Sequence, residues 1–425
     1  MLHFNLNDLS LGWAFSSLLF GCVVGCILVG HLTDLYGRRR LLLWVAALFA
    51  ITSVATGLAP NFRSFIIARF IGGLAVGGIS LISPMYVAEV SPPSLRGRMG
   101  TLYQLSIVAG GFTSYCINYL MRNIGPDNWR WMFITGVAPS ALFFILLLFA
   151  PETPRYLVIA GKHEEALRIL ERIAGSASAK FALSEIKASL QTKRNSWRDL
   201  FQPGIRRVVA VSFCLAILVH VSGISTVVDY APIIFRSAGW QINAALFSTF
   251  ILGAANLLFT IVALWVIDRW GRKPLYIVGS LGMAASLLSL SVTVMAGHFH
   301  GLLVLFLILG YLAFFEACIG PVFWTLVPEI FPNNIRGIAM TIPVLTQWIA
   351  NGIVVLFFPS AFNRIGKAST FGVLALMALI QAVFTWFFVP ETKNKPLEEM
   401  EEFWQIRRVK VSPSQTNINP RLLKP

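Results

Sequence analysis

The chain has 425 residues, of which 56% are hydrophobic and 12% are charged. An ordinary soluble domain carries roughly 25% charged residues, so this composition excludes a string of soluble domains and predicts an integral membrane protein. The net charge of +15 does not indicate nucleic-acid binding, because the basic residues are interspersed with long apolar runs instead of gathering on one polar domain.

Eleven apolar stretches are long enough to cross a bilayer, which takes about 20 residues in a helix. Barrel strands would be shorter and would alternate in polarity, so these stretches predict helices. The predicted fold class is an all-α integral membrane protein with eleven transmembrane helices. In chain order the expected spans are 10–33, 41–60, 64–88, 99–121, 131–150, 207–235, 243–267, 274–297, 301–327, 337–358 and 368–389.

The polar segments between these spans predict how the chain is oriented in the membrane. If residues 34–40 lie inside, the inside segments hold 27 of the 34 Lys and Arg residues. Because cytoplasmic loops carry the excess of Lys and Arg, we expect the N-terminus outside and the C-terminus in the cytoplasm. No cleavable signal peptide is apparent, which favours a multi-pass protein of a cell membrane, inner or plasma.

The polar segments also divide the chain. We expect a first transmembrane bundle of five helices at 1–150, a cytoplasmic linker at 151–205, a second bundle of six helices at 206–390 and a cytoplasmic tail at 391–425. In the linker, Leu167, Leu170 and Ile173 have amphipathic helical spacing, which predicts short helices.

The sequence shows no sign of catalytic chemistry. The five cysteines fall in apolar stretches without metal-ligand spacing, so we interpret them as packing residues. No Walker A sequence or pair of catalytic carboxylates in a polar domain indicates an enzyme. We therefore predict no cofactor and no metal.

Three short signatures occur twice, in the same order. The matching segments are Asp34 to Arg39 with Asp268 to Lys273, Glu89 to Gly97 with Glu329 to Gly337, and Pro151 to Thr153 with Pro390 to Thr392. Their offsets of 234, 240 and 239 residues are nearly constant, which predicts two homologous halves. Parallel repeated halves with a substrate site between them are typical of one large class of secondary transporters.

The repeat also indicates that the first half is shorter. In the second half, 61 residues separate position 207 from Asp268, enough for two spans. Only 33 residues precede Asp34, enough for one. The first helix of a twelve-helix plan is therefore expected to be missing, either because the true start lies upstream or because the chain is a truncated relative.

These motifs resemble the major facilitator superfamily, and specifically its sugar-porter family of glucose facilitators and proton-coupled sugar symporters. The resemblance runs from about Leu9 to Trp404 and rests on GHLTDLYGRRR at 30–40, PMYVAEVSPPSLRGR at 84–98, PETPRYL at 151–157, GPVFWTLVPEIFPNNIRG at 320–337 and VPETKNKPLEEM at 389–400. It implies a transporter that moves a small solute, above all a monosaccharide, by alternating access, as facilitator or proton symporter. The partners it implies are the bilayer, a sugar and protons, with no nucleic acid.

Charged residues repeat at the expected cytoplasmic helix ends of both halves. We hypothesise that they latch the cytoplasmic side shut in an outward-facing state and separate as the halves rock. The alternative is that they cap helices and anchor the chain by the positive-inside rule. The proposed gate residues are Asp34, Arg38, Glu89, Arg96, Glu152, Asp268, Arg272, Glu329, Arg336 and Glu391.

Glycines recur at spacings that allow close helix approach. Gly73 and Gly77 form a small-xxx-small pair, and Gly21, Gly25 and Gly30 line an earlier span. We interpret all five as packing residues.

A sugar needs amide and hydroxyl partners for its own hydroxyls and an aromatic face for its ring. Polar residues inside spans are costly, so they are candidate ligands. The alternative for each amide is a hydrogen bond between two helices. By the family pattern, the expected substrate-binding residues are Gln104, Asn256, Glu316, Trp324, Gln347, Trp348 and Asn351.

The seventh helix of the family plan departs from the pattern. Sugar porters usually read Gln-Gln-x-Ser-Gly-x-Asn there, followed by a Tyr-Tyr pair, whereas this chain has His220, Ser225 and Asp229-Tyr230. His220 and Ser225 stand at sugar-holding positions, so they join the candidate substrate ligands.

Three residues are candidates for proton coupling, namely His220, Asp229 and Arg69. Intramembrane ionisable residues indicate function by default. The alternative places Asp229 near the outer water and makes His220 a hydrogen-bonding cavity residue. In proton-coupled relatives, a carboxylate on the first helix pairs with the arginine that matches Arg69, so Arg69 is expected to lack that partner here.

Two rival functions remain at this stage. The altered seventh helix favours a different solute, such as a polyol, an organic acid or an organic ion. The absent first helix favours a truncated, sensor-like relative that binds solute without moving it.

Overall fold

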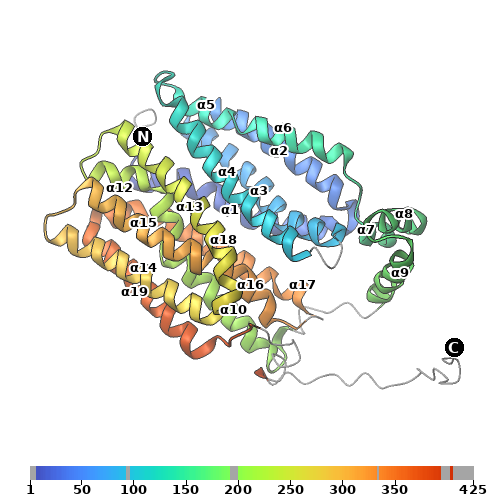
Figure 1. Ribbon diagram of the computed structural model, residues 1–425. Helices are drawn as coiled ribbons and strands as arrows, with labels where there is room; N and C mark the ends of the chain where they lie inside the picture. Colours follow the sequence, from blue (N-terminus) through green and yellow to red (C-terminus); the bar gives the residue numbers. More distant parts are fainter. Residues whose placement is uncertain (1–5, 92–95, 192–199, 333–334, 394–402, 405–425) are drawn as a thin grey trace, which may run out of the picture.

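The computed structural model describes residues 6–91, 96–191, 200–332, 335–393 and 403–404, and within these ranges every regular element is a helix (Figure 1). The first half contains α1 (Asp8–Tyr36), α2 (Arg38–Gly57), α3 (Phe62–Val90), α4 (Arg96–Leu120), the short 3-10 helix η1 (Met121–Asn123), α5 (Asn128–Ile134) and α6 (Val137–Phe149). The linker contains α7 (Pro154–Ile159), α8 (His163–Ala174) and α9 (Ser176–Gln191). The second half contains α10 (Ile205–Val221), α11 (Ile224–Asp229), α12 (Ala231–Ser237), α13 (Ile242–Trp270), α14 (Arg272–Met295), α15 (Gly301–Cys318), α16 (Gly320–Ile330), α17 (Arg336–Ala339), α18 (Thr341–Arg364) and α19 (Lys367–Phe388).

Ten helical segments in the described ranges are long and apolar enough to cross a membrane, and each coincides with one of the predicted spans. The remaining prediction, 99–121, coincides with α4, a helix of 25 residues. It is more polar than the others because Gln104, Ser106, Thr113 and Asn118 lie along it. The all-α membrane fold is thus confirmed.

Two spans of the second half are broken near their middle. Gly223, with φ of 95°, separates α10 from α11. Ile319 ends α15, and Pro321 stands in the first turn of α16. Such interruptions are tolerated at membrane depth where the freed backbone lies inside the protein or lines a cavity. Side chains next to both breaks are therefore candidates to face a cavity.

Glycines bring α1 and α3 into backbone contact. A Cβ at Gly21 would collide with the carbonyl of Phe70, and one at Gly25 with the carbonyl of Leu74. On α3, a Cβ at Gly73 or Gly77 would collide with a carbonyl of α1. The predicted packing role is confirmed for these four glycines. A Cβ at Gly30 would meet only a leucine methyl at 3.4 Å, so it does not share that role.

The two halves meet along two helix pairs, α1 with α18 and α4 with α13 (Figure 1). A Cβ at Gly12 would collide with the Leu356 carbonyl, and the Asn363 amide donates to Asp8 Oδ1 at 2.8 Å. On the other pair, the Tyr119 ring packs against that of Phe247 in a tilted arrangement, with ring centroids 5.6 Å apart. These contacts lie at the end opposite the repeated motifs. We call this end the closed face, and the end that carries Gly37 and Gly271 the motif face.

The second half contains one helix, α10, that has no described counterpart in the first half. In the second half, α10 packs against both α18 and α19. In the described part of the first half, no helix occupies the matching place beside α4 and α6. Only 11% of the apolar window of Asn128–Phe149 is buried, against 24–56% for the other spans. Within the described residues, the first half thus shows five spans, α4 included, and the second half shows six.

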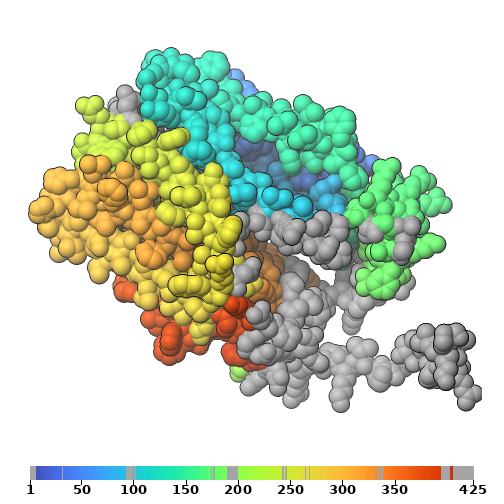
Figure 2. All heavy atoms as spheres, in the orientation of Figure 1, coloured from blue at the N-terminus to red at the C-terminus, as the bar shows by residue number. Residues whose placement is uncertain are grey.

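The linker helices lie at the motif face, beside the first half (Figures 1 and 2). Their small core joins Leu157 and Val158 of α7 to Ala166 and Ile169 of α8. Leu170 is buried and Ile173 packs against this core, whereas Leu167 is half-buried. The predicted amphipathic helix is present, with its buried face turned slightly from the one expected.

We expect Gly73→Ala to lower stability by about 1–3 kcal/mol, because the added methyl pushes two backbones apart. The measurement is thermal unfolding of the purified protein in detergent. The matched control is Gly110→Ala on α4, where a Cβ would meet no other heavy atom within 4 Å. The control should be neutral or stabilising, since alanine favours a helix over glycine by about 1 kcal/mol. Equal melting temperatures for the two variants would contradict the close α1–α3 packing.

Candidate functional site

A cavity of about 330 Å³ lies between the two halves. The first half contributes one face of α4, and the second half contributes α10, α13, α15, α16 and α18. Its lining residues are Gln104, Ile107, Val108, Gly111, Phe112, Tyr115, Val219, His220, Gly253, Asn256, Phe315, Glu316, Gly320, Phe323, Trp324 and Gln347. His220 lies shortly before the break at Gly223, and Gly320 follows the break at Ile319. Both breaks therefore border the cavity.

Most of the sequence-predicted ligands meet at this cavity. Six of the nine candidates line it, namely Gln104, His220, Asn256, Glu316, Trp324 and Gln347. The other three, Trp348, Asn351 and Ser225, are not among its lining residues. Asn351 is buried in α18, and Trp348 and Ser225 are half-buried.

Several polar atoms of the cavity are buried and could hydrogen-bond a ligand. Glu316 is 6% exposed, and its Oε2 accepts a hydrogen bond from Thr260 Oγ1 at 3.2 Å. Asn256 Oδ1 and His220 Nδ1 are buried, and neither has a hydrogen-bond partner in the described part of the chain. Buried polar atoms without partners are costly, so hydroxyl groups that enter the cavity would be stabilised there.

Sequence reasoning missed the aromatic lining of the first half. Phe112 and Tyr115 face the cavity from α4, where Gln104, Val108 and Gly111 share their side. This spacing of three and four residues marks one helix face. The signal was present in the sequence, because once Gln104 is placed in the cavity the helical period brings Tyr115 to the same face three turns later.

Arg69 has a different environment from the one expected. Its Nε donates to the Ala14 carbonyl at 3.4 Å, and its guanidinium lies 5.5 Å from the Phe133 ring centroid. It also interacts electrostatically with Asp229 of the second half. The first-helix carboxylate of proton-coupled relatives is not found among the described residues, as expected, and Asp229 of α11 is the carboxylate that acts on Arg69 from the other half.

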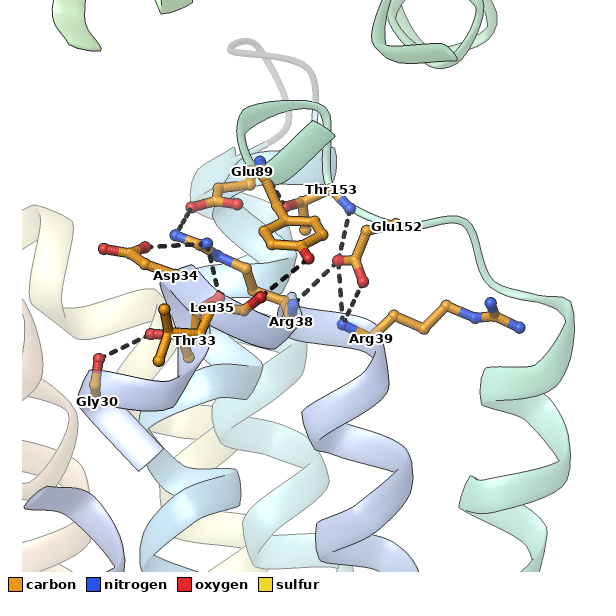
Figure 3. A network of polar contacts seen from close by, with 10 residues as sticks. Gly30, Thr33, Asp34, Leu35, Arg38, Arg39, Glu89, Glu152 and Thr153 are labelled. Carbon is orange, nitrogen blue, oxygen red and sulfur yellow. Dashed lines mark hydrogen bonds and ion pairs between the residues drawn. The ribbon is translucent and has the colours of Figure 1, made fainter. Parts of the chain in front are cut away.

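The repeated motifs of the first half form one cluster at the motif face (Figure 3). The Arg38 guanidinium contacts Asp34 Oδ1 and Glu89 Oε1, each at 3.2 Å. Glu152 accepts from the backbone N–H groups of Arg38 and Arg39 at 3.0 and 3.1 Å, so it caps the start of α2. A carboxylate there is favourable because helix N-termini carry a partial positive charge. Arg39 in turn donates to the Leu147 and Leu148 carbonyls at the end of α6.

The second half repeats the main contacts of this cluster. Arg272 binds Glu329 with two hydrogen bonds of 3.0 and 3.2 Å. Glu391 caps α14 through the backbone N–H groups of Arg272 and Lys273 at 3.0 and 3.1 Å. Lys273 Nζ donates to the Trp386 carbonyl at 2.7 Å, as Arg39 does on α6. Gly37 and Gly271 join the helix pairs with the same backbone, at φ of 89° and 90°.

These contacts give the motif residues a role within each half. Every ion pair and hydrogen bond of these two clusters stays within one cluster. Together they fix the turns between α1 and α2 and between α13 and α14. The side chains of Arg96, Asp268 and Arg336 lie outside the described part of the structure. The latch between halves therefore stays a prediction, whereas helix capping, the alternative weighed for these residues, is present for Glu152 and Glu391.

Residues 5–404 match the family model described as "Sugar (and other) transporter". The chain belongs to the sugar-porter family of the major facilitator superfamily. It is 38% identical to the arabinose-proton symporter of Bacillus subtilis (strain 168), over 94% of this chain and 88% of that protein. It is also 38% identical to the D-xylose-proton symporter of Escherichia coli (strain K12), over 93% of this chain and 86% of that protein.

Solved structures agree with this sugar-porter assignment. The inward-open conformation of the xylose transporter XylE from E. coli matches with a TM-score of 0.82 at 36% identity, covering 94% of this chain and 91% of that chain. The protein is thus a multi-pass membrane transporter and not an enzyme. In the described ranges no group of three or more metal-ligating side chains could hold a metal ion.

We expect Glu391→Ala to lower the stability of this sugar porter by about 2 kcal/mol, because hydrogen bonds to charged groups contribute about 1.5–3 kcal/mol. The substitution removes the acceptor for the first N–H groups of α14. Thermal unfolding in detergent measures the loss, and Glu152→Ala should show a similar one at α2. The control is Glu164→Ala on α8, whose carboxylate is 93% exposed and 3.8 Å from Arg168. A control that loses as much stability as the two caps would refute the capping role.

Proposed function

We propose that this protein imports a monosaccharide together with protons by alternating access. The observation that carries the proposal is the cavity between the halves, which is lined by amide, carboxylate and aromatic side chains and separated from the closed face by the α1–α18 and α4–α13 contacts. A cavity closed on one side of the membrane is what an alternating-access carrier presents to its substrate.

The cavity chemistry favours an uncharged, hydroxylated solute. Gln104, Asn256 and Gln347 offer amide groups from both halves, and Trp324 and Phe323 offer aromatic surfaces. Amides both donate and accept hydrogen bonds, which suits hydroxyl groups, and aromatic faces suit the apolar side of a sugar ring. The arabinose-proton and xylose-proton symporters among the relatives support a pentose or hexose as the substrate class.

The same reasoning extends to orientation and domain division. The Lys and Arg excess lies on the motif face, so this face is assigned to the cytoplasm, the closed face to the outside, and the membrane to the cell's inner or plasma membrane. The structure then represents an inward-facing state, in keeping with its likeness to the inward-open XylE conformation. The bundles at 1–150 and 206–390, joined by the 151–205 linker, are the bodies that rock.

The direct experiment is uptake of radiolabelled pentoses, hexoses and polyols into proteoliposomes, with and without an imposed inward proton gradient. The expected result is saturable uptake of one sugar that overshoots equilibrium when the gradient is imposed. Gln104→Ala should raise the KM for that sugar about fivefold, since one hydrogen bond is worth about 1 kcal/mol and 1.4 kcal/mol is a factor of ten.

The matched control is Gln241→Ala, an exposed amide that caps nothing at the start of α13. It should leave the KM unchanged. Uptake of a polyol, organic acid or organic ion in place of every sugar would overturn the substrate class. Binding of sugar without counterflow would overturn transport itself and identify a sensor-like relative.

A further inference from the structure

Arg69 and the end of α11, which carries Asp229, come from different halves and meet on one turn of α1. Arg69, on α3, donates through Nε to the Ala14 carbonyl at 3.4 Å. Asp229 ends α11, and the next residue, Tyr230, packs its ring 4.6 Å from that of Phe15. Because Ala14 and Phe15 are adjacent, the same stretch of α1 holds the guanidinium from one side and the α11 end from the other.

The two charges interact across the boundary between the halves. Arg69 and Asp229 attract each other, although Ala14 is the one hydrogen-bond partner described for Arg69. The other titratable groups around them are few: Tyr115 of α4 and Tyr230 interact with Asp229, and Cys22 of α1 interacts with Arg69. Within the described residues, Asp229 is thus the carboxylate that balances this intramembrane arginine.

The pair belongs to the closed face. Gly12, two residues before Ala14, packs on Leu356 of the second half, and the Tyr230 hydroxyl donates to the Val355 carbonyl at 2.9 Å. Opening this face must move α11 and α18 away from α1 and α3. The same movement separates Asp229 from Arg69, whereas an ion pair within one half would be indifferent to rocking.

We propose that Arg69 and Asp229 form a proton-sensitive contact between the halves, which couples closure of the outer face to the protonation of Asp229; this inference rests on the proposed proton symport. Ionised Asp229 attracts Arg69 and holds the face closed. Protonated Asp229 carries no charge, so the attraction is lost and the face opens more readily.

The direction of coupling follows from the geometry. When the outer face is open, Asp229 is separated from Arg69 and accessible to protons from outside. When the face closes, Arg69 approaches and favours the ionised carboxylate, so the proton is released once the carrier faces inward. The proton therefore crosses in the same direction as the sugar. It is carried by Asp229 of the second half, whereas Arg69 belongs to the first.

The first test compares wild type with Asp229→Asn in proteoliposomes. Asp229→Asn keeps the side-chain shape without the charge, so gradient-driven accumulation should be lost while sugar counterflow persists. Asp229→Glu should restore accumulation. The control is Asp127→Asn, the same chemical change at an exposed site of the first half next to Arg130, which should leave both activities unchanged. Accumulation that survives in Asp229→Asn overturns the proposal.

A second readout does not depend on the substrate. Spin labels on Ile124→Cys and Gln241→Cys, both exposed at the closed face, report the distance between the halves at about pH 8 and about pH 5.5, which bracket the range where perturbed carboxylates titrate. Acidification should populate longer distances in wild type and leave Asp229→Asn unchanged. If wild type transports no sugar, the proposed function fails, and the distances still decide this proposal: a pH-independent wild-type distance overturns it.

Discussion

The hydrocarbon core of the bilayer offers no hydrogen-bond partners, and this constraint decides where polar groups lie in the structure. A polar group that enters lipid without a partner costs several kcal/mol, so each backbone group and each polar side chain must be satisfied within the protein. Helices meet this demand for the backbone. Polar side chains meet it at the capped corners of the motif face, and Glu316 meets it in the cavity through Thr260. Asn256 Oδ1 and His220 Nδ1 are exceptions in the cavity, because neither has a partner in the described part of the chain.

The contacts within each half differ from the contacts between the halves. Within the first half, glycines lock α1 to α3, and Glu152 ties the start of α2 to the end of α6 by way of Arg39. Between the halves, the described contacts gather at the closed face and include apolar rings, close helix approach, the hydrogen bond from Asn363 to Asp8 and the attraction between Arg69 and Asp229. We expect rocking to open this boundary while the contacts within each half stay in place.

The internal repeat makes the differences between the halves informative. The two motif clusters share the Arg–Glu pair, the Glu cap on the following helix and the φ of Gly37 and Gly271. The cavity is far less symmetrical, because α4 alone represents the first half while five helices represent the second. Within the described residues, no helix covers α4 and α6 as α10 covers the second half. The halves thus differ most at the cavity where we propose that the solute binds, and least at the corners between consecutive helices.

The sequence by itself determined the all-α membrane fold, the order of the spans and the two homologous halves, because apolar length and motif spacing are local properties of the chain. It also indicated six of the cavity residues, since a costly amide or carboxylate inside a span has few other uses. Tertiary structure decided the rest. Tyr115 and Phe323 are ordinary apolar positions until a neighbouring helix leaves them beside a cavity. In proton-coupled relatives the carboxylate that pairs with this arginine lies on the first helix of the family plan, so the sequence pointed to no partner for Arg69. The separation of Arg69 and Asp229 along the chain gives no sign that the end of α11 would pack on the turn of α1 that Arg69 contacts. Contacts of that kind depend on how two bundles pack, which no local pattern records.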